Sequence, residues 1–201
     1  MIFDKFYPIF DTSEWLKRLL PIGIKFVQLR IKDKSKKEIQ SEIKKAKLLC
    51  YDYNAQLVVN DYWETAIDEK CDFVHIGQED LANCNIKKLK SNNIKIGIST
   101  HDREELKTAL LHSPDYIALG PIYPTILKKM KWTQQGVDKL SEWKKQISYI
   151  PLVAIGGMTP PRSTEAFIAG ADIVSAVTDI TLNPDPEARV KEWLETIKNN
   201  V

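Results

Sequence analysis

Short apolar runs alternate along this chain with longer segments in which apolar residues recur every three or four positions. The short runs are typical of buried strands, and the longer segments of helices that cover a sheet. Strand candidates lie near residues 6–10, 25–30, 57–60, 72–76, 94–98, 115–119, 152–155 and 172–177. Such alternation predicts a parallel sheet. About eight repeats in 201 residues favour an α/β fold, a closed (β/α)₈ barrel (TIM barrel) forming a single domain over residues 1–201.

Several helix candidates carry start signals or one apolar face. Thr12 is expected to cap the first helix, and Asp102 precedes a segment with acids in its first turn. The segment 36–50 places lysines and glutamates opposite an apolar face made of Ile39, Ile43, Ala46 and Leu49. The last helix, after Pro184, is expected to bury Val190, Trp193 and Ile197.

Polar residues follow the apolar run of nearly every strand candidate. Because the carboxyl ends of parallel strands share one rim in a barrel, these residues are expected to converge although they lie far apart in sequence. This layout is typical of an enzyme. The residues concerned are Gln28, Arg30, Lys32, Asn60, Asp61, Gln78, Glu79, Asp80, Ser99, Thr100, His101, Gly156 and Gly157.

The two acids that end neighbouring strands, Asp61 and Asp80, carry the clearest candidate chemistry. Two such carboxylates can hold Mg²⁺, or they can divide general-acid and general-base work. Exposed carboxylates are common on any surface, and the flanking Asn60 supports the metal because a magnesium ion keeps waters that need acceptors and donors around it. Arg30, Lys32 and Lys128 supply positive charge suited to a pyrophosphate.

A phosphate site is indicated on another part of the rim. Gly156-Gly157 lets backbone N–H groups approach a phosphate closely, and Val177 and Thr178 stand where the last strand leads into a helix. The long segment 121–136 lacks a period and is either a solvated loop or an active-site lid. Neither a GxGxxG nor a GxxxxGK[ST] motif occurs, which weakens a nucleotide-binding reading.

Composition narrows the class of protein. Hydrophobic residues make up 43% and charged residues 28%, and the formal charge of +2 gives no reason to expect nucleic acid as a partner. No apolar run is long enough to span a membrane, and the first residues lack the layout of a secretory signal. Three cysteines without CxxC spacing indicate free thiols and a cytoplasmic location. His75, inside an apolar strand, is expected to be a buried, hydrogen-bonded core residue.

Six blocks, in order along the chain, resemble the thiamine phosphate synthase family. The blocks are Val27–Lys32, Val59–Asp61, His75–Asp80, Ile96–His101, Asp115–Thr125 and Ala154–Met158. The resemblance implies a (β/α)₈ barrel. It also implies an enzyme that joins 4-amino-5-hydroxymethyl-2-methylpyrimidine diphosphate to 4-methyl-5-(2-phosphoethyl)thiazole, releasing pyrophosphate and forming thiamine monophosphate by a dissociative mechanism. The implied partners are these small molecules alone, and a homodimer is compatible with the sequence.

The resemblance also implies roles for individual residues. Asp61 and Asp80 would hold Mg²⁺, with Ser99 beside the reacting centre and Lys128 on the pyrophosphate. The residues implied to contact the pyrimidine diphosphate are Gln28, Arg30, Lys32 and Asn60. Those implied to hold the thiazole phosphate are Thr125, Gly157, Val177 and Thr178.

The chain departs from the family pattern at three positions. Leu127 stands where a second threonine of the loop is expected, so that one hydroxyl is missing unless Thr133 or water replaces it. Thr178 and Asp179 stand where serine and alanine are usual, and Asp179 adds an anion near the proposed phosphate site.

Three other functions remain open at this point. A thiazole tautomerase of the sister family would need a histidine where Pro121 stands, and it would not need Asp61 and Asp80. A sugar-phosphate aldolase would use Lys32 for a Schiff base, which requires a desolvated lysine. A barrel that binds thiamine precursors without catalysis is the third.

Overall fold

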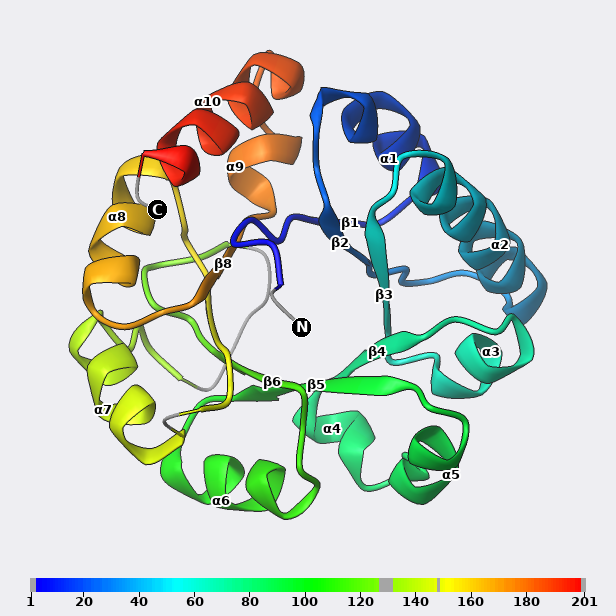
Figure 1. Ribbon diagram of the computed structural model, residues 1–201, viewed down its shortest axis with the longest axis horizontal. Coiled ribbons are helices and arrows are strands. Elements are labelled where there is room, and N and C mark those ends of the chain that lie inside the picture. The colour runs from blue at the N-terminus through cyan, green and yellow to red at the C-terminus, as the bar shows by residue number, and fades with distance from the viewer. Residues whose placement is uncertain (1–2, 127–131, 148, 200–201) are drawn as a thin grey trace.

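The computed structural model describes residues 3–126, 132–147 and 149–199, and within these it contains one parallel sheet of eight strands in sequential order. Figure 1 shows these strands as an inner ring with the helices around it. The strands are β1 (Ile9–Phe10), β2 (Phe26–Leu29), β3 (Gln56–Asn60), β4 (Phe73–Ile76), β5 (Lys95–Thr100), β6 (Tyr116–Leu119), β7 (Leu152–Ile155) and β8 (Ile173–Ser175). Each lies within or close to a range expected from the sequence.

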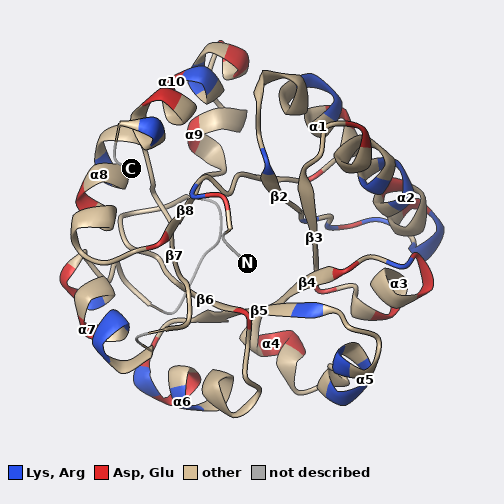
Figure 2. Cartoon of the chain, in the orientation of Figure 1, with Lys and Arg blue, Asp and Glu red and all other residues tan. Residues whose placement is uncertain are grey.

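Helices connect successive strands on the outside of the ring. They are α1 (Ser13–Leu19), a 3₁₀ turn η1 (Leu20–Ile22), α2 (Lys36–Asp52), α3 (Trp63–Asp68), α4 (Gln78–Leu81), α5 (Ile86–Ser91), α6 (Arg103–Leu111), α7 (Asp138–Ile147), α8 (Pro160–Ile168), α9 (Thr178–Thr181) and α10 (Pro186–Lys198). Figure 2 places most lysine, arginine, aspartate and glutamate residues on these helices and few on the strands.

Backbone hydrogen bonds join the last strand to the first segment and close the ring. Tyr7 N–H donates to the carbonyl of Val174 at 2.9 Å, and Ile9 N–H donates to the carbonyl of Ala176 at 3.0 Å. In the other direction, Val174 N–H donates to the carbonyl of Lys5 at 2.9 Å. The expected closed (β/α)₈ barrel is therefore confirmed.

The interior of the barrel is filled by alternate residues of its strands. One cluster of buried residues occupies the amino-terminal half: Tyr7, Phe26, Val58, Phe73, Tyr116, Ala118, Val153 and Ile173. Phe3 packs against it from the chain's amino-terminal end, with its ring centroid 5.4 Å from that of Phe26. Because successive side chains of a strand point to opposite faces, residues two positions further along a strand face the same interior.

Helix boundaries follow local signals with two differences from the expectations. Thr12 is the N-cap of α1 but its side chain makes no capping hydrogen bond; instead the N–H of Ser13 donates to Oε2 of Glu42 at 2.7 Å. In α2, Ile39, Ile43 and Ala46 are buried as expected, Leu49 is partly buried against the core, and Cys50, four positions after Ala46, is buried as well. In α10, Val190, Trp193 and Ile197 are buried as expected.

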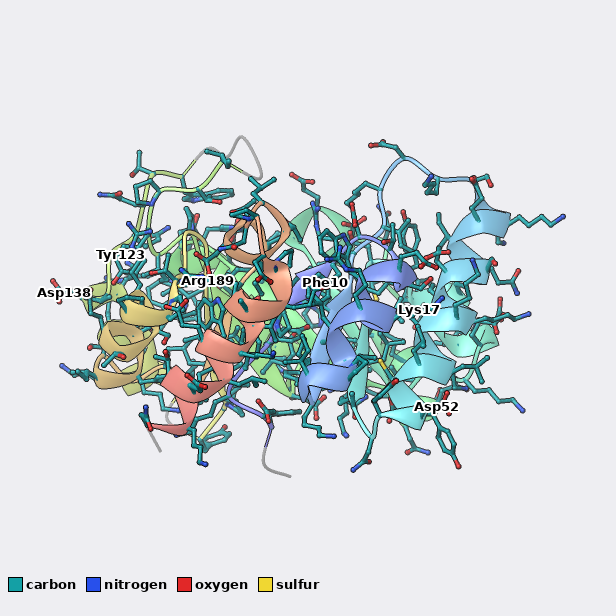
Figure 3. The ribbon with its side chains drawn as sticks, turned by 90° about the horizontal axis from the view of Figure 1, so that it is seen from above. Phe10, Lys17, Asp52, Tyr123, Asp138 and Arg189 are labelled. Atoms are coloured by element: carbon teal, nitrogen blue, oxygen red, sulfur yellow. The ribbon has the colours of Figure 1, made fainter. Side chains whose placement is uncertain are left out.

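Both ends of the barrel are distinct in the side view of Figure 3. Tyr123, which follows β6, lies toward one rim, and Asp52, at the end of α2, lies toward the other. The first rim carries the carboxyl ends of the strands. No described helix is long and apolar enough to cross a membrane. Cys50, Cys71 and Cys84 are all free thiols.

Gly97 is expected to be indispensable for packing the barrel interior. An added Cβ would lie 2.0 Å from Cζ of Tyr116, whose side chain is fully buried. Since overpacking of a filled core forces strain on its neighbours, Gly97→Ala is expected to lower the free energy of unfolding by at least about 2 kcal/mol. Urea denaturation measures this.

The control is Gly77→Ala, where the added carbon would meet no atom beyond its chain neighbours closer than 3.8 Å. Equal stability losses in the two variants would contradict this description of the interior.

Candidate active site

A cavity of about 210 Å³ opens at the carboxyl-terminal rim of the strands. All the site residues expected from the sequence line it, apart from Lys128, which lies outside the described residues. They are Gln28, Arg30, Lys32, Asn60, Asp61, Asp80, Ser99, Thr125, Gly157, Val177 and Thr178. The predicted convergence of these distant positions on one rim is thereby confirmed.

The side chains of Asp61 and Asp80 meet at the mouth of this cavity. A carbon built on Gly77 would lie 3.9 Å from Oδ1 of Asp61 and 3.8 Å from Oδ2 of Asp80, so both carboxylates approach one point. Partial burial raises the pKa of Asp80, and the neighbouring charge and hydrogen bond of Asp61 raise it further. Two acids held together in this way need a positive charge between or beside them.

Lys32 and Asn60 both contact the carboxylate of Asp61. Lys32 Nζ lies 2.9 Å from Oδ2 of Asp61, and Nδ2 of Asn60 donates to the same oxygen at 2.5 Å. Asp61 itself has φ of 61°, a left-handed conformation that is uncommon for a residue with a side chain. Strain of this kind is concentrated at functional sites, where the surrounding structure holds it in place.

A chain of buried hydrogen bonds runs beneath the cavity from Gln28 to Ser99. Gln28 Nε2 donates to the hydroxyl of Tyr7 at 2.8 Å, and the hydroxyls of Tyr7 and Tyr116 lie 2.8 Å apart. Nδ1 of His75 lies 2.7 Å from the Tyr116 hydroxyl, and its Nε2 lies 2.8 Å from Oγ of Ser99. The chain therefore links two residues of the cavity wall through the barrel interior.

The direction of this chain follows from its first donor. Because the Gln28 amide donates to the Tyr7 oxygen, the Tyr7 hydroxyl donates to Tyr116, and the Tyr116 hydroxyl donates to Nδ1 of His75. Burial lowers the pKa of His75 to about 4, opposed by the charge of Asp61 and assisted by that of Arg30. The imidazole is accordingly neutral at pH 7 and carries its proton on Nε2, where it donates to Ser99. The expectation that His75 is a satisfied core histidine is confirmed, and its position against Ser99 adds a second role.

The glycines after β7 form the opposite wall. Gly156 and Gly157 have φ of 96° and 64°, and a carbon added to Gly157 would lie 2.4 Å from the carbonyl oxygen of Pro124. This close approach brings the segment after β6, with its cis Gly120-Pro121 bond, against the end of β7. Only glycine fits this arrangement, and it leaves Gly157 exposed to the cavity.

Asp179 points away from the cavity into contacts with α10. Arg189 binds it with two hydrogen bonds, Nε to Oδ2 at 2.8 Å and Nη2 to Oδ1 at 2.7 Å. Trp193 Nε1 donates to Oδ2 at 2.8 Å. The extra anion noted in the sequence is therefore neutralised by a bidentate ion pair, whose labelled arginine can be found in Figure 3.

The segment expected to be a lid is described only at its two ends, because residues 127–131, including Leu127 and Lys128, lie outside the described structure. The Trp132 ring stacks on His101 with centroids 4.2 Å apart, and Gln135 Nε2 donates to the His101 carbonyl at 2.7 Å. Thr133 is exposed and is not among the described residues that line the cavity.

Sequence reasoning missed several residues of the cavity wall. Ile9, Ile155 and Ser175 line it, as does Trp132 at the mouth. The first three lie two positions beyond Tyr7, Val153 and Ile173 of the inner cluster. The period of two along each strand would have found them, whereas the place of Trp132 depends on the path of a long loop.

Removal of the Tyr116 hydroxyl is expected to break the buried hydrogen-bond chain. Tyr116→Phe keeps the ring but leaves Nδ1 of His75 without a donor and the Tyr7 proton without its acceptor, which should cost about 1–3 kcal/mol of unfolding free energy. Thermal and urea denaturation measure the loss. Tyr149→Phe, at a side chain 89% exposed, is the control and should change little. Equal stability of both variants with the parent would show that the chain contributes nothing.

Comparison with known proteins agrees with the resemblance seen in the motifs. A family model described as thiamine monophosphate synthase matches residues 4–180. A thiamine-phosphate synthase of Rhizobium etli is 52% identical over 194 residues, which cover 96% of this chain and 95% of that protein. One of Salmonella typhimurium is 39% identical over 188 residues, covering 94% of this chain and 89% of that protein.

Among solved structures, thiamine phosphate pyrophosphorylase from Pyrococcus furiosus superimposes with a TM-score of 0.87 at 25% identity. The match covers 98% of this chain and 96% of that one. With the family model matching most of the chain and relatives of high identity over nearly its whole length, the chain belongs to the thiamine monophosphate synthase family, whose members are transferases.

Proposed function

We propose that this protein joins 4-amino-5-hydroxymethyl-2-methylpyrimidine diphosphate to 4-methyl-5-(2-phosphoethyl)thiazole, forming thiamine monophosphate and pyrophosphate. The observation that carries the proposal is the pairing of Asp61 and Asp80 at the mouth of a cavity whose other wall is a glycine turn. An acid pair suits a metal-bound diphosphate, and a glycine turn beside a strand end suits a phosphate monoester.

Mg²⁺ fits the acid pair on the chemistry of the donors. Both are carboxylates, burial and the neighbouring charge of Asp61 raise the pKa of Asp80, and Mg²⁺ prefers oxygen ligands. Within the described residues no cluster of three or more potential ligand side chains occurs, so waters and diphosphate oxygens would have to complete the coordination of such an ion. When bound, the ion would neutralise charge on the departing pyrophosphate.

The basic residues would act on the same leaving group. Lys32 lies 2.9 Å from Asp61 and is about half exposed, so it can exchange that contact for a phosphate oxygen when a cation joins the acids. Arg30 lines the cavity two residues before it on the same segment. Lys128 is assigned to the pyrophosphate by the family resemblance alone.

The buried chain would hold the pyrimidine ring. Since Nε2 of Gln28 is occupied by Tyr7, its amide oxygen is the group available to accept from an amino substituent. Ser99 receives its hydrogen bond from His75, which leaves its own proton for the substrate beside the reacting carbon. Asn60 orients Asp61 beneath the diphosphate.

The thiazole phosphate would lie against the opposite wall, held by Thr125, Gly157, Val177 and Thr178. The first turn of α9 begins at Val177 and Thr178, and Arg189 removes the charge of Asp179 from this region. An anionic group can therefore approach without meeting a free carboxylate.

The reaction fits a dissociative course. Pyrophosphate leaves first with the bond's electron pair, and the thiazole nitrogen attacks the resulting pyrimidine-stabilised carbocation to form the new carbon–nitrogen bond. The residues of the chain bind and orient the two substrates and neutralise charge on the leaving pyrophosphate, in a site partly screened from water. Because the thiazole nitrogen is the nucleophile, no nucleophilic side chain is needed. The thiazole nitrogen supplies the electrons.

Two rival functions fit the site less well. Lys32 is 46% exposed and paired with Asp61, whereas a Schiff-base lysine would be desolvated. Pro121 stands in a cis bond where a tautomerase would place its histidine, and the paired acids would have no task in a tautomerase.

We place the activity in the cytoplasm, because free cysteines are typical of a reducing compartment. A homodimer is the proposed oligomeric state, and light scattering would measure it.

The direct test is incubation with both precursors, with and without Mg²⁺, followed by mass spectrometry. Thiamine monophosphate and pyrophosphate in equal amounts, formed only with the metal, are expected. Absence of thiamine monophosphate under saturating conditions would reject the proposal.

Neutral isosteres at the acid pair are expected to separate activity from stability. Asp61→Asn and Asp80→Asn should each lower kcat/KM by about 100-fold or more, by the loss of charge that holds the cation. Asp80→Asn should leave unfolding free energy unchanged or raised, because the fold disfavours ionisation of Asp80. Asp52→Asn, an exposed acid near the opposite rim, is the control. Full metal-dependent activity in either site variant would refute the metal assignment.

The ion pair of Asp179 is expected to protect the phosphate wall. Arg189→Met keeps an apolar stem but frees the Asp179 carboxylate, so KM for the thiazole phosphate should rise about three- to tenfold, corresponding to roughly 1 kcal/mol of repulsion. The double variant Arg189→Met/Asp179→Ala should recover most of the affinity. Steady-state kinetics at saturating pyrimidine diphosphate measure both, and failure of the second substitution to rescue would mean that charge is not the cause.

A further inference from the structure

One buried polar atom of the cavity wall has no use in the protein itself. Among the described residues, Ser175 Oγ is the single buried side-chain nitrogen or oxygen atom without a hydrogen-bond partner. Ser175 is 2% exposed and lines the cavity. An unpaired buried hydroxyl costs stability, and native proteins satisfy nearly all such groups. A hydroxyl left in this state at a binding cavity therefore points to a ligand atom.

The surroundings of Ser175 define the chemistry of that ligand. It is the last residue of β8, aligned with Ile155 of β7, and the next carbonyl, that of Ala176, accepts from Ile9 N–H. Ile9 and Ile155 both line the cavity, so the hydroxyl lies in an apolar part of the wall. The hydrogen-bonded chain of the interior, which runs from Gln28 through Tyr7, Tyr116 and His75 to Ser99, does not include Ser175. A flat ring with one apolar edge and one polar edge would fit between the isoleucines around Ser175 and the polar chain from Gln28 to Ser99.

We propose that Ser175 donates a hydrogen bond to a ring nitrogen of the aminopyrimidine substrate and thereby selects that ring. This inference rests on the proposed function. The aminopyrimidine carries two ring nitrogens that accept hydrogen bonds, and its methyl group suits the neighbouring isoleucines. The thiazole is the poorer match, because its nitrogen must keep its lone pair for attack and its sulfur is a weak acceptor.

The mechanism predicts which kinetic constant responds. A donor on a ring nitrogen withdraws electron density, so it does not favour a carbocation on the same ring over the bound substrate. Its contribution therefore lies in binding the substrate, so its loss raises KM and does not lower kcat. Ser175 is thus a specificity-determining residue, whose loss should leave turnover intact.

The test compares Ser175→Ala with the parent enzyme in the presence of Mg²⁺. KM for the pyrimidine diphosphate should rise about three- to tenfold, the usual net worth of one hydrogen bond, with kcat retained and KM for the thiazole phosphate unchanged. In the absence of substrate, the melting temperature should be unchanged or higher, since an unpaired hydroxyl is removed. A structural role would instead lower the melting temperature.

Ser163→Ala is the matched control. Ser163 is also fully buried, but its Oγ donates to the carbonyl of Pro160 at 2.6 Å within α8. This variant should lose stability and keep both KM values. Ser175→Ala is thus expected to lose affinity but no stability, and Ser163→Ala to lose stability but no affinity.

Substrate analogues with one ring nitrogen replaced by a C–H group locate the contact. The parent should disfavour one of the two analogues by a further three- to tenfold factor that Ser175→Ala abolishes. Equal discrimination by parent and variant against both analogues would overturn the inference, as would an unchanged KM. Thiamine monophosphate formation by the parent is scored in the same assay, so a failure of the proposed function is seen separately.

Discussion

The interior of a closed eight-stranded barrel has to be filled by side chains of its own strands, and this constraint organises the molecule. In the amino-terminal half, aromatic and aliphatic residues such as Phe26, Phe73 and Tyr116 fill it. Two residues further along the strands, polar side chains face the same interior. Buried polar groups must be hydrogen-bonded, and the chain from Gln28 through the two tyrosines to Ser99 meets that need.

The charges at the mouth follow from the same geometry. Because β3 and β4 are paired neighbours, the segments that follow them bring Asp61 and Asp80 together, and burial and then the charge of Asp61 raise the pKa of Asp80. Lys32 neutralises part of the negative charge of this acid pair through its contact with Asp61. The proposed Mg²⁺, bound together with the diphosphate, would neutralise the remaining negative charge. The acid pair would then be more stable with the substrate bound than without it.

Much of the fold and the site could be predicted from the sequence, because both depend on local periodicity. Short apolar runs located the strands, a period of 3.6 located the longer helices, and the strand ends placed Asp61 near Asp80. Contacts set by the path of the chain could not be foreseen: Tyr116 reaches His75 across 41 positions, and Arg189 turns Asp179 away from the cavity. Thr12 makes no side-chain capping hydrogen bond, and the contact found beside it, from Ser13 N–H to Glu42 on α2, joins residues 29 positions apart.

Anomalous diffraction from crystals grown with Mn²⁺ and the pyrimidine diphosphate tests the central claim most directly. Mn²⁺ replaces Mg²⁺ at oxygen sites and is visible by its own scattering. The expected result is one peak within about 2.3 Å of carboxylate oxygens from both Asp61 and Asp80, with diphosphate oxygens completing the coordination. A peak bound by neither aspartate, with the diphosphate in the cavity, would contradict the account.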